Sequence, residues 1–508
     1  MLVFISRRLI AGLLVLFVAS FIVYILMSKA GDPLAFIAEI QNEEQRIAIE
    51  KAVRDGLNLD TPVIGRFFLW LRDLFTGEWF GISARTQLPI GDDLRSRIPV
   101  TLKLVGAATI LSMVVGTTVG VVTAIRQYSG FDYLVTFFTF VFFSLPSFWV
   151  GVILKDIGGI QFNDWLRDSA RFSPAVLVGI GVVAFILIYT SAGGEPRRKL
   201  AVAAIGTGVI EAVLIYVSAT EWLRNPGLGP VVTALFAVLI ALGLTAVMAG
   251  LRNVKARNTA LTTAAIGAVL WFPLQIWLDD MSFWKLLLFA VVSIGVGVGV
   301  GYAWGGFDKG LSGRIGGLTA FLISIVIFVD RAMQSWDDYA SNSVIRNRPI
   351  KTIGDRETRL EGDFWQHVND TFGHIILPTM VLMLISVATY TRYSRSSMLE
   401  VFNQDYMRTA RSKGLTERTI IVRHGLRNAL IPLATVMTLD ISGVLGGAVI
   451  TETVFEWNGM GRMFIDALRA LDPNPVMAFL VITAGCAIVF NIIADLLYAV
   501  LDPRIRIT

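Results

Sequence analysis

Long apolar runs recur along the whole chain, and they constrain its fold more than any other feature. A helix needs about 20 apolar residues to cross the hydrocarbon core of a bilayer, which is about 30 Å thick. Charged residues make up only 16% of the 508 residues, against roughly a quarter in a typical soluble domain. The sequence therefore predicts an all-α polytopic membrane protein with about 12 membrane helices. The expected spans are residues 8–28, 101–125, 133–154, 173–191, 200–219, 230–251, 260–278, 284–304, 315–330, 374–391, 429–451 and 476–501.

The charges of the loops predict how the chain is threaded through the membrane. Arg7 and Arg8 precede the first run, which is longer than a signal-peptide core and has no small-residue cleavage site after it. We therefore expect an uncleaved first helix with its N-terminus inside. The basic loops 193–199, 252–258 and 305–314 then all fall inside, as the positive-inside rule demands. Both termini are expected in the cytoplasm.

A basic segment, residues 392–428, lies between two expected spans on the cytoplasmic side, with eight basic and three acidic residues. Good helix formers occupy residues 405–413. Gly414 is expected to end this helix, because glycine tolerates the positive φ found just past a helix end. A second helix is expected over residues 416–428, with Pro432 near the start of the next span. A loop that only sets orientation would explain the charge, but not two helices joined by a glycine.

This segment, which reads DYMRTARSKGL…RHGLRNALIP, resembles the cytoplasmic loop of the dipeptide/oligopeptide permease family of ABC importers. Ala410 and Gly414 match the general importer pattern of Glu-Ala-Ala, three residues and Gly, whereas Arg408 and Thr409 replace its Glu and first Ala. Asn458 stands where the family usually has proline. The other similar blocks, in order, are GDP (31–33), LDTP (59–62), RIPVTLKL (97–104), SLPSFWVG (144–151), HIILPTMVL (374–382), ITETVFEWNGMGR (450–462) and NIIADLLYAVLDPRIR (491–506).

The resemblance implies the type I ABC importer transmembrane fold and a permease subunit that couples peptide passage to a cytoplasmic ATPase. It implies a second permease subunit in a heterodimer, two cytoplasmic ATP-binding subunits and an extracytoplasmic substrate-binding protein, in the lipid of the bacterial cytoplasmic (plasma) membrane. No G-x-x-x-x-G-K-[ST] stretch exists, so the chain is not expected to bind ATP itself. We expect no catalytic residues, cofactor, metal or nucleic-acid partner. The resemblance assigns Asp405, Arg408, Thr409, Ala410, Arg411, Lys413 and Gly414 to the ATPase-coupling loop, and makes Ser144, Pro146, Ser147, Glu452 and Thr453 candidates for the pathway.

The resemblance lapses between about residues 155 and 361, where six further spans are expected. An even number of inserted spans keeps the basic segment on the cytoplasmic side. We expect this insert to be an accessory bundle outside the pathway. The expected organisation is a first membrane helix (1–28), an external loop or cap (29–100), family-like spans two and three (101–154), an inserted six-helix bundle with external linkers (155–360), and the last three family-like spans with the coupling loop 392–428 (361–508).

Some residues allow sharper hypotheses. The overlapping small-residue pairs formed by Gly295, Gly297, Gly299 and Gly301 favour close helix packing in lipid. Glu211 lies in the middle of an inserted span, where an acid suggests function by default. With no basic residue in a neighbouring span, we expect it to be protonated or hydrogen-bonded and to face another helix.

A stand-alone secondary carrier or channel for a small polar solute, driven by ions through Glu211, is the alternative function. Such a carrier does not need the ATPase-docking element that residues 392–428 supply. His367 and His374 lie near two aspartates, but their spacing is not that of a standard metal site. Asp495 in the last span is expected to make an internal polar contact. The sequence leaves open whether a dipeptide, a longer peptide, a nickel chelate, glutathione or an oligosaccharide is carried.

Overall fold

The computed structural model describes residues 2–76 and 79–501, and every named element in these ranges is a helix. The chain divides into two compact units. Unit 1 comprises Met1–Ile157, Thr352–Asp355 and Ile375–Thr508, and unit 2 comprises Gly158–Lys351 and Arg356–His374.

Ten helices in the described part of the chain are long and apolar enough to cross a membrane, and there are up to eleven spans if one bent pair is a single span. The expected span 429–451 coincides with α18 (Arg427–Val454), whose side chains are only partly described and which is not in this count. The expected fold class, an all-α multi-pass membrane protein, is confirmed.

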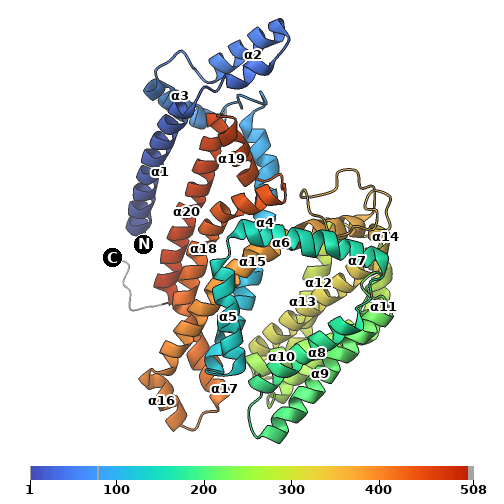
Figure 1. Ribbon diagram of the computed structural model, residues 1–508. Helices are drawn as coiled ribbons and strands as arrows, with labels where there is room; N and C mark the ends of the chain where they lie inside the picture. Colours follow the sequence, from blue (N-terminus) through green and yellow to red (C-terminus); the bar gives the residue numbers. More distant parts are fainter. Residues whose placement is uncertain (1, 77–78, 502–508) are drawn as a thin grey trace. The chain divides into compact units, whose positions relative to one another are not determined.

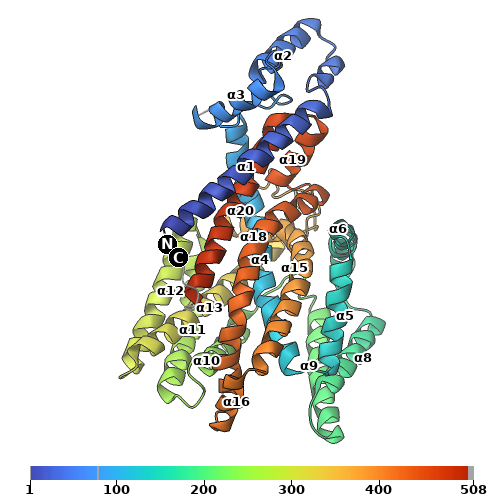
Figure 2. The ribbon, with the colours of Figure 1, turned by 90° about the vertical axis from the view of Figure 1, so that its left-hand side faces the viewer.

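Unit 1 is built around α20 (Pro473–Leu501), which packs against both α1 (Leu2–Ala30) and α18, as Figures 1 and 2 show. The other long helices of this unit are α4 (Ile90–Ile125) and α15 (Phe364–Phe402), which begins in unit 2 and continues through unit 1. Its shorter helices are η1 (Ala35–Glu39), α2 (Glu43–Gly56), α3 (Val63–Thr76), α5 (Gly130–Ser144), α6 (Ser147–Leu154), α16 (Asp405–Ser412), α17 (Glu417–Thr419), η3 (Ile420–Leu426) and α19 (Met460–Arg469).

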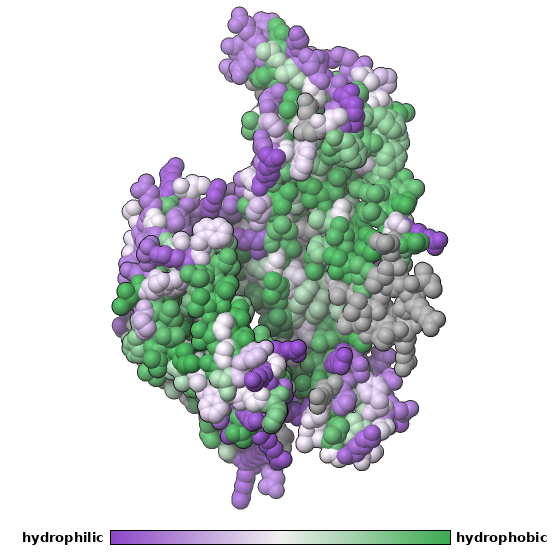
Figure 3. Space-filling view, turned by 180° about the vertical axis from the view of Figure 1, so that it is seen from behind, coloured by the Kyte–Doolittle hydropathy of each residue, from purple (hydrophilic) through white to green (hydrophobic). Residues whose placement is uncertain are grey.

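The surface of unit 1 changes in polarity along the long helices. Figure 3 shows hydrophilic side chains over α2 at one end and over α16 at the other, with hydrophobic side chains between them. This distribution is that of a protein whose middle faces hydrocarbon and whose two ends face water. The segment expected as an external cap and the basic segment therefore lie at opposite ends of the unit.

An aromatic core fastens α3 to the first membrane helix. In α3, Phe67, Trp70, Leu71 and Leu74 recur at helical spacing and form one apolar face. Phe67 is fully buried, and its ring centroid lies 5.7 Å from that of Tyr24 in α1 and 5.9 Å from that of Trp70. Such aromatic pairs contribute about 0.5–1.5 kcal/mol each beyond the area they bury.

The expectation of one continuous span over residues 133–154 is wrong. The chain breaks between α5 and α6, and the helices on either side are bent by 103°. The cause is local: Pro146 forces the residue before it out of the helical region, and Leu145 is extended with φ −82° and ψ 128°. After α6, a π-helical turn, η2 (Lys155–Gln161), leads into α7 (Phe162–Asp168).

Unit 2 contains six helices that meet the criteria for a membrane span. Two of them, α8 (Pro174–Ser191) and α9 (Pro196–Ala219), pack chiefly against each other as a hairpin. The other four form a bundle with an alanine-rich core, which includes Ala241 and Ala260 (Figure 1). The bundle comprises α10 (Gly229–Met248), α11 (Val254–Asp279), α12 (Phe283–Trp304) and α13 (Lys309–Gln334), and it is followed by the short α14 (Trp336–Ala340).

Two of the four glycines in α12 bring it close to α13. A Cβ built at Gly297 would meet the backbone of Gly316, and one built at Gly301 would meet the backbone of Ser312 and Gly313. The expected close packing is thus confirmed for Gly297 and Gly301. Gly295 and Gly299 have open space beside them, so for this pair the expectation is wrong. A spacing of two residues places the two pairs on different faces of the helix.

Candidate functional site

The basic segment forms a compact projection at one end of unit 1 (Figure 1). Its inner side is apolar, because Met407 and Ala410 of α16 pack with Ile420 against Phe402 at the end of α15. Met407 and Ile420 have no exposed surface. Apart from Ala410, the residues expected in the coupling loop all point outward: Asp405, Arg408, Thr409, Arg411, Lys413 and Gly414 are exposed.

Gly414 ends α16 in the way the sequence predicted. Its φ is +71°, a left-handed conformation that disfavours residues with a Cβ. Its N–H donates to the carbonyl of Arg411 at 2.9 Å, and the N–H of Leu415 lies 3.4 Å from the carbonyl of Ala410. These bonds close the last turn of the helix. A Cβ built at Gly414 would meet no atom within 4 Å, so the glycine faces open space.

The expected second helix, over residues 416–428, does not end before the next span. The three residues of α17 run through the π-helical turn η3 directly into α18. Pro432 therefore lies inside a helix and not near its start, which corrects the prediction. The part of the projection that follows Gly414 and the next span are therefore one helical segment, whereas α16 is joined to it by the turn at Gly414.

The charges of the projection are partly paired within it. The guanidinium of Arg411 donates to Glu417 at 3.0 Å, and Arg408 lies 3.6 Å from Asp405. Lys413 has no ion pair among the described residues. Two apolar side chains that the sequence reasoning missed are also exposed here: Tyr406 is 40% and Leu415 is 41% exposed. The sequence could have indicated both side chains, since each is a bulky apolar residue in a polar segment.

The structure brings together the two blocks expected to border a pathway. The helix α6, which follows the bend at Pro146, packs against the end of α18. A Cβ at Gly151 would lie 3.2 Å from a methyl of Val454. Lys155 donates its ammonium to the carbonyl of Val454 at 3.1 Å, at the C-terminus of α18 where a cation is favourable. Ser144 and Pro146 are exposed, and Ser147 and Thr453 are partly exposed.

Glu452 differs from the other pathway candidates because it has no exposed surface. One carboxylate oxygen accepts from the hydroxyl of Thr101 at 2.6 Å, and the other accepts from the backbone N–H groups of Gly461 at 2.7 Å and Arg462 at 3.1 Å. The carboxylate thus joins α4 and α18 to the N-terminus of α19, where a negative charge is favoured. Its position makes it an anchor, and it cannot touch a solute in this conformation.

Asn458, which replaces a proline of the resembling family, has a partner of its own. It accepts from the guanidinium of Arg97 at 2.6 Å, and the same guanidinium pairs with Asp93 at 2.7 Å. The turn before α19 is therefore held to α4 by a side-chain hydrogen bond.

Two glycines of α4 seat it against α15, a contact the sequence reasoning missed. A Cβ at Gly116 would lie 2.7 Å from Cβ of Tyr390, and one at Gly120 would lie 2.6 Å from the carbonyl oxygen of Thr391. The hydroxyl of Ser394 donates to the carbonyl of Thr117 at 3.2 Å. The signal was the G-x-x-x-G spacing, which allows helices to approach closely in lipid.

An ion pair joins α15 to α5 near the origin of the projection. Arg395 donates to both carboxylate oxygens of Asp132, at 2.9 and 3.0 Å, in the two-pronged geometry that is strongest for this pair. Further into the unit, the hydroxyl of Tyr390 donates to Asp440 of α18 at 2.7 Å. Asp440 is an acid within an expected span that the sequence reasoning did not single out.

The remaining polar hypotheses concern unit 2. Glu211 of α9 lies against Gly181 of α8, facing another helix as expected, and its Oε1 has no hydrogen-bond partner among the described residues. His374 is buried, with its Nδ1 3.3 Å from a carboxylate oxygen of Asp370. The described residues contain no group of three or more His, Cys, Asp or Glu that could hold a metal ion.

Known proteins resemble this chain over part of its length. An oligopeptide transport system permease protein (AppB) of Bacillus subtilis is 47% identical over 140 residues, which are 28% of this chain and 44% of that protein. An oligopeptide transport system permease protein (OppB) of Mycobacterium tuberculosis is 35% identical over 208 residues, covering 41% of this chain and 64% of that one. A dipeptide transport system permease protein (DppB) of Escherichia coli is 48% identical over 137 residues, 27% of this chain and 40% of the relative. The chain spans less than two thirds of the length of each.

Two family models also match, and together they extend over almost the whole chain. The model described as the N-terminal part of a binding-protein-dependent transport system membrane component matches residues 1–107. The model described as the binding-protein-dependent transport system inner membrane component matches residues 116–507. The second match covers more than half of the chain and includes α5, α6, α16, α18 and α19, which carry the surfaces described above. The chain therefore belongs to the family of binding-protein-dependent transport system inner membrane components.

Proposed function

We propose that this chain is a permease subunit of an ATP-driven peptide importer, with α16 and the turn at Gly414 as the element that docks on a cytoplasmic ATPase. The observation that carries the proposal is the projection itself. It is exposed on its outer side, packed on its inner side, and continuous with α18. A membrane protein that works alone has no use for such an element. The similarity to dipeptide and oligopeptide permeases supports a peptide as the solute.

The proposed complex contains a second permease subunit, two ATP-binding subunits and an extracytoplasmic binding protein. Peptide termini are charged, so their route must be lined by protein and water and not by lipid. We place this route between unit 1 and the matching surface of the second permease, bordered by Ser144, Pro146, Ser147 and Thr453. Glu452 supports this border from behind, through its bonds to α4 and α19. The end of the unit that bears α16 would face the cytoplasm.

Coupling would pass from the projection to the membrane helices as a rigid-body motion. The projection continues into α18, and α15 is held to α4 by close packing and to α5 by the Arg395–Asp132 pair. A displacement of α16 would therefore be passed to α5, before the bend at Pro146, and through the end of α18 to α6, after the bend. The alternative, a stand-alone carrier driven through Glu211, has less support, because Glu211 of α9 lies against a glycine, and its Oε1 has no hydrogen-bond partner among the described residues.

The test compares two substitutions of Gly414 in a complex reconstituted with its ATPases and binding protein. Gly414→Leu should hydrolyse ATP but import less peptide, because a Cβ in the left-handed conformation costs about 1 kcal/mol and the bulk blocks the docking surface. Gly414→Asn is the control, since asparagine tolerates this conformation, and it should keep most of the import. Uptake per ATP hydrolysed is the readout. Unchanged coupling in Gly414→Leu would refute the assignment of α16.

A further inference from the structure

A cavity of about 520 Å³ lies where α1, α18 and α20 meet in unit 1. Its size is in the range of ligand pockets, which is roughly 300–1,000 Å³. Small and aliphatic side chains of α1 and α20 form nearly all of its wall. They are Ala11, Gly12, Val15, Leu16 and Ala19 of α1, and Ala484, Ala487, Ile488, Ile492 and Ala494 of α20.

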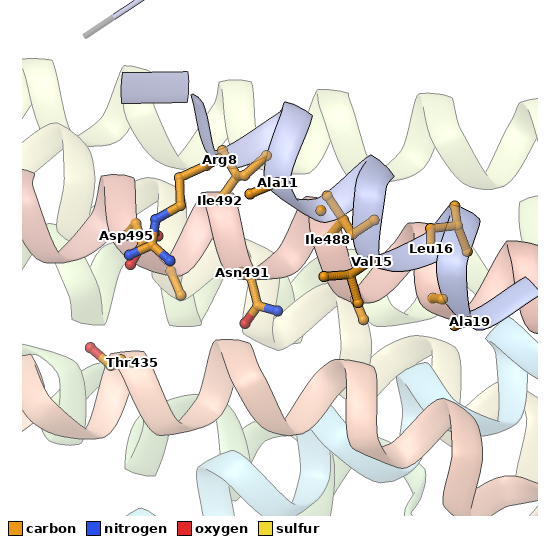
Figure 4. Close-up of a pocket in the computed structure, with 14 residues that line it drawn as sticks. Arg8, Ala11, Val15, Leu16, Ala19, Thr435, Ile488, Asn491, Ile492 and Asp495 are labelled. Atoms are coloured by element: carbon orange, nitrogen blue, oxygen red, sulfur yellow. The ribbon is translucent and has the colours of Figure 1, made fainter. Parts of the chain in front are cut away.

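The polar groups of the cavity gather at one end. Figure 4 shows Arg8 extending from α1 toward Asp495 of α20, with Asn491 one turn away on α20 and Thr435 on α18. Nε of Arg8 lies 3.2 Å from a carboxylate oxygen of Asp495. The side chains of Arg8 and Asp495 are 57% and 32% exposed, so both remain open to a further partner. The amide of Asn491 has no hydrogen bond among the described residues.

The length of the cavity matches one leaflet of a bilayer. The two helices are antiparallel here, with Arg8 near Asp495 and, farther along, Gly12 against Ile488. From Arg8 to Ala19 the wall along α1 is about 16 Å long at 1.5 Å per residue. Arg8 and Asp495 lie about two turns inside the ends of α1 and α20. The hydrocarbon core is about 30 Å thick, so a cavity of this length covers about half of it. A membrane helix of a partner protein would need a groove across both leaflets.

We propose that this cavity binds one phospholipid with a zwitterionic, amine-bearing headgroup, such as phosphatidylethanolamine. Arg8 would donate to the phosphate, and Asp495 with the carbonyl of Asn491 would accept from the primary ammonium. One acyl chain would lie along the alanine-lined wall. A headgroup with both charges suits a site that presents one cation and one anion side by side. The choice does not depend on which solute the chain transports.

The headgroup chemistry predicts an order among lipids. Phosphatidylcholine carries a trimethylammonium that cannot donate hydrogen bonds to Asp495, and phosphatidylglycerol has no cation for it. The full-length chain is to be placed in nanodiscs with equal amounts of the three lipids and then released for native mass spectrometry. Phosphatidylethanolamine should be the lipid that stays bound at one copy per chain.

Variants of the two charged residues test the site directly. Arg8→Gln should reduce retained phosphatidylethanolamine by roughly tenfold, the size of one charge-assisted hydrogen bond. Arg7→Gln is the matched control, because Arg7 is the neighbouring exposed arginine and does not line the cavity. It should retain lipid like the unmodified chain. Asp495→Asn should remove the preference for ethanolamine over choline while leaving a lipid bound.

A variant that fills the cavity distinguishes loss of the acyl-chain site from loss of the Arg8–Asp495 ion pair. Ala484→Phe at the deep end leaves Arg8 and Asp495 in place but occupies the space for the acyl chain, so it should also lose the retained lipid. The proposal is overturned if the three lipids are retained equally, or if Arg8→Gln and Arg7→Gln behave alike. It is also overturned if the lipid is absent from the unmodified chain and the cavity is instead closed by the second permease.

Discussion

Glu452 is the residue through which α4, α18 and α19 are held together. Three hydrogen-bond donors meet at one carboxylate without exposed surface. Removing such a partner leaves buried N–H groups unsatisfied, which costs about 1–3 kcal/mol for each group. Glu452, although it lies near the proposed pathway, is therefore expected to affect the stability of the protein and not the binding of the solute.

The first prediction at this scale concerns that anchor. Glu452→Ala should lower the thermal unfolding midpoint of the purified chain, because the N–H groups of Gly461 and Arg462 lose their acceptor. Glu456→Ala is the control: its side chain is exposed, and its carboxylate is 4.0 Å from Arg462, so its ion pair is weak. Tryptophan fluorescence during heating measures the unfolding midpoint of each variant. Equal midpoints for Glu452→Ala and Glu456→Ala would contradict the anchoring role.

A second prediction concerns Asp472, which lies just before α20 and accepts from the hydroxyl of Ser83 at 2.7 Å. Burial raises the pKa of its carboxyl above the ordinary value of 3.8. The folded state therefore holds this proton more tightly than the unfolded state, and the associated stability is lost as the pH rises through the folded pKa. The difference in unfolding midpoint between Asp472→Asn and the unmodified chain should grow in favour of the variant as the pH rises from about 4 to about 7. A difference in unfolding midpoint that stays the same over this pH range would contradict the prediction.

At the scale of elements, small residues decide which helices move together. Gly116 and Gly120 let the backbone of α4 touch α15, whereas Gly106 of the same helix has open space beside it. The helix pair is fastened further by the hydroxyl of Thr391, which lies 3.3 Å from the carbonyl of Gly116. The projection is rooted in α15 and α18, so this contact belongs to the proposed path of coupling.

The prediction for the contact of α4 with α15 compares a glycine at the contact, Gly120, with one that has open space beside it, Gly106. Gly120→Ala should force α4 and α15 apart, because its methyl would meet the carbonyl of Thr391 and Cβ of Ser394, and overpacking of this kind costs about 1–3 kcal/mol. Gly106→Ala should be neutral or slightly stabilising, since alanine is the better helix former. Thermal unfolding and ATPase activity of the assembled complex are the measurements. A loss of the same size in both variants would show that the contact is not the cause.

At the scale of the whole molecule, the question is what the six membrane helices of unit 2 do. Its hairpin and four-helix bundle are held by packing of alanines and glycines. In α8 to α13, buried acids are few: Asp330 accepts from Trp271 and from two backbone N–H groups, so it is occupied within the unit. These helices offer a charged peptide little to bind, which supports an accessory role.

The prediction for the whole molecule is that unit 1 transports without the helices of unit 2. Residues 160–350 are replaced by a short polar linker, keeping Thr352–Asp355, because Gly354 donates to the carbonyl of Phe455 at 2.9 Å within unit 1. Uptake and ATPase activity should persist, with lower stability of the assembly. Glu211→Gln in the full-length chain should import normally. An assembled but inactive deletion, or an inactive Glu211→Gln, would show that unit 2 takes part in transport.

Most of the long membrane helices and the turn of the projection at Gly414 could be predicted from the sequence alone. These features depend on local chemistry: apolar length, loop charge and the left-handed conformation that Gly414 adopts. The bend at Pro146 and the run of η3 into α18 were within reach of local rules but were missed, because a long apolar run hides a break and a proline can lie inside a helix.

Which residues work together follows from the packing of helices that are far apart in the sequence. Glu452 meets Thr101 across 351 residues of sequence, and Arg395 meets Asp132 across 263. Arg8 and Asp495 come from opposite ends of the chain and meet at the mouth of the α1–α20 cavity. Local patterns cannot specify such pairs, because burial, and therefore the need of a carboxylate for a partner, arises only when distant helices pack.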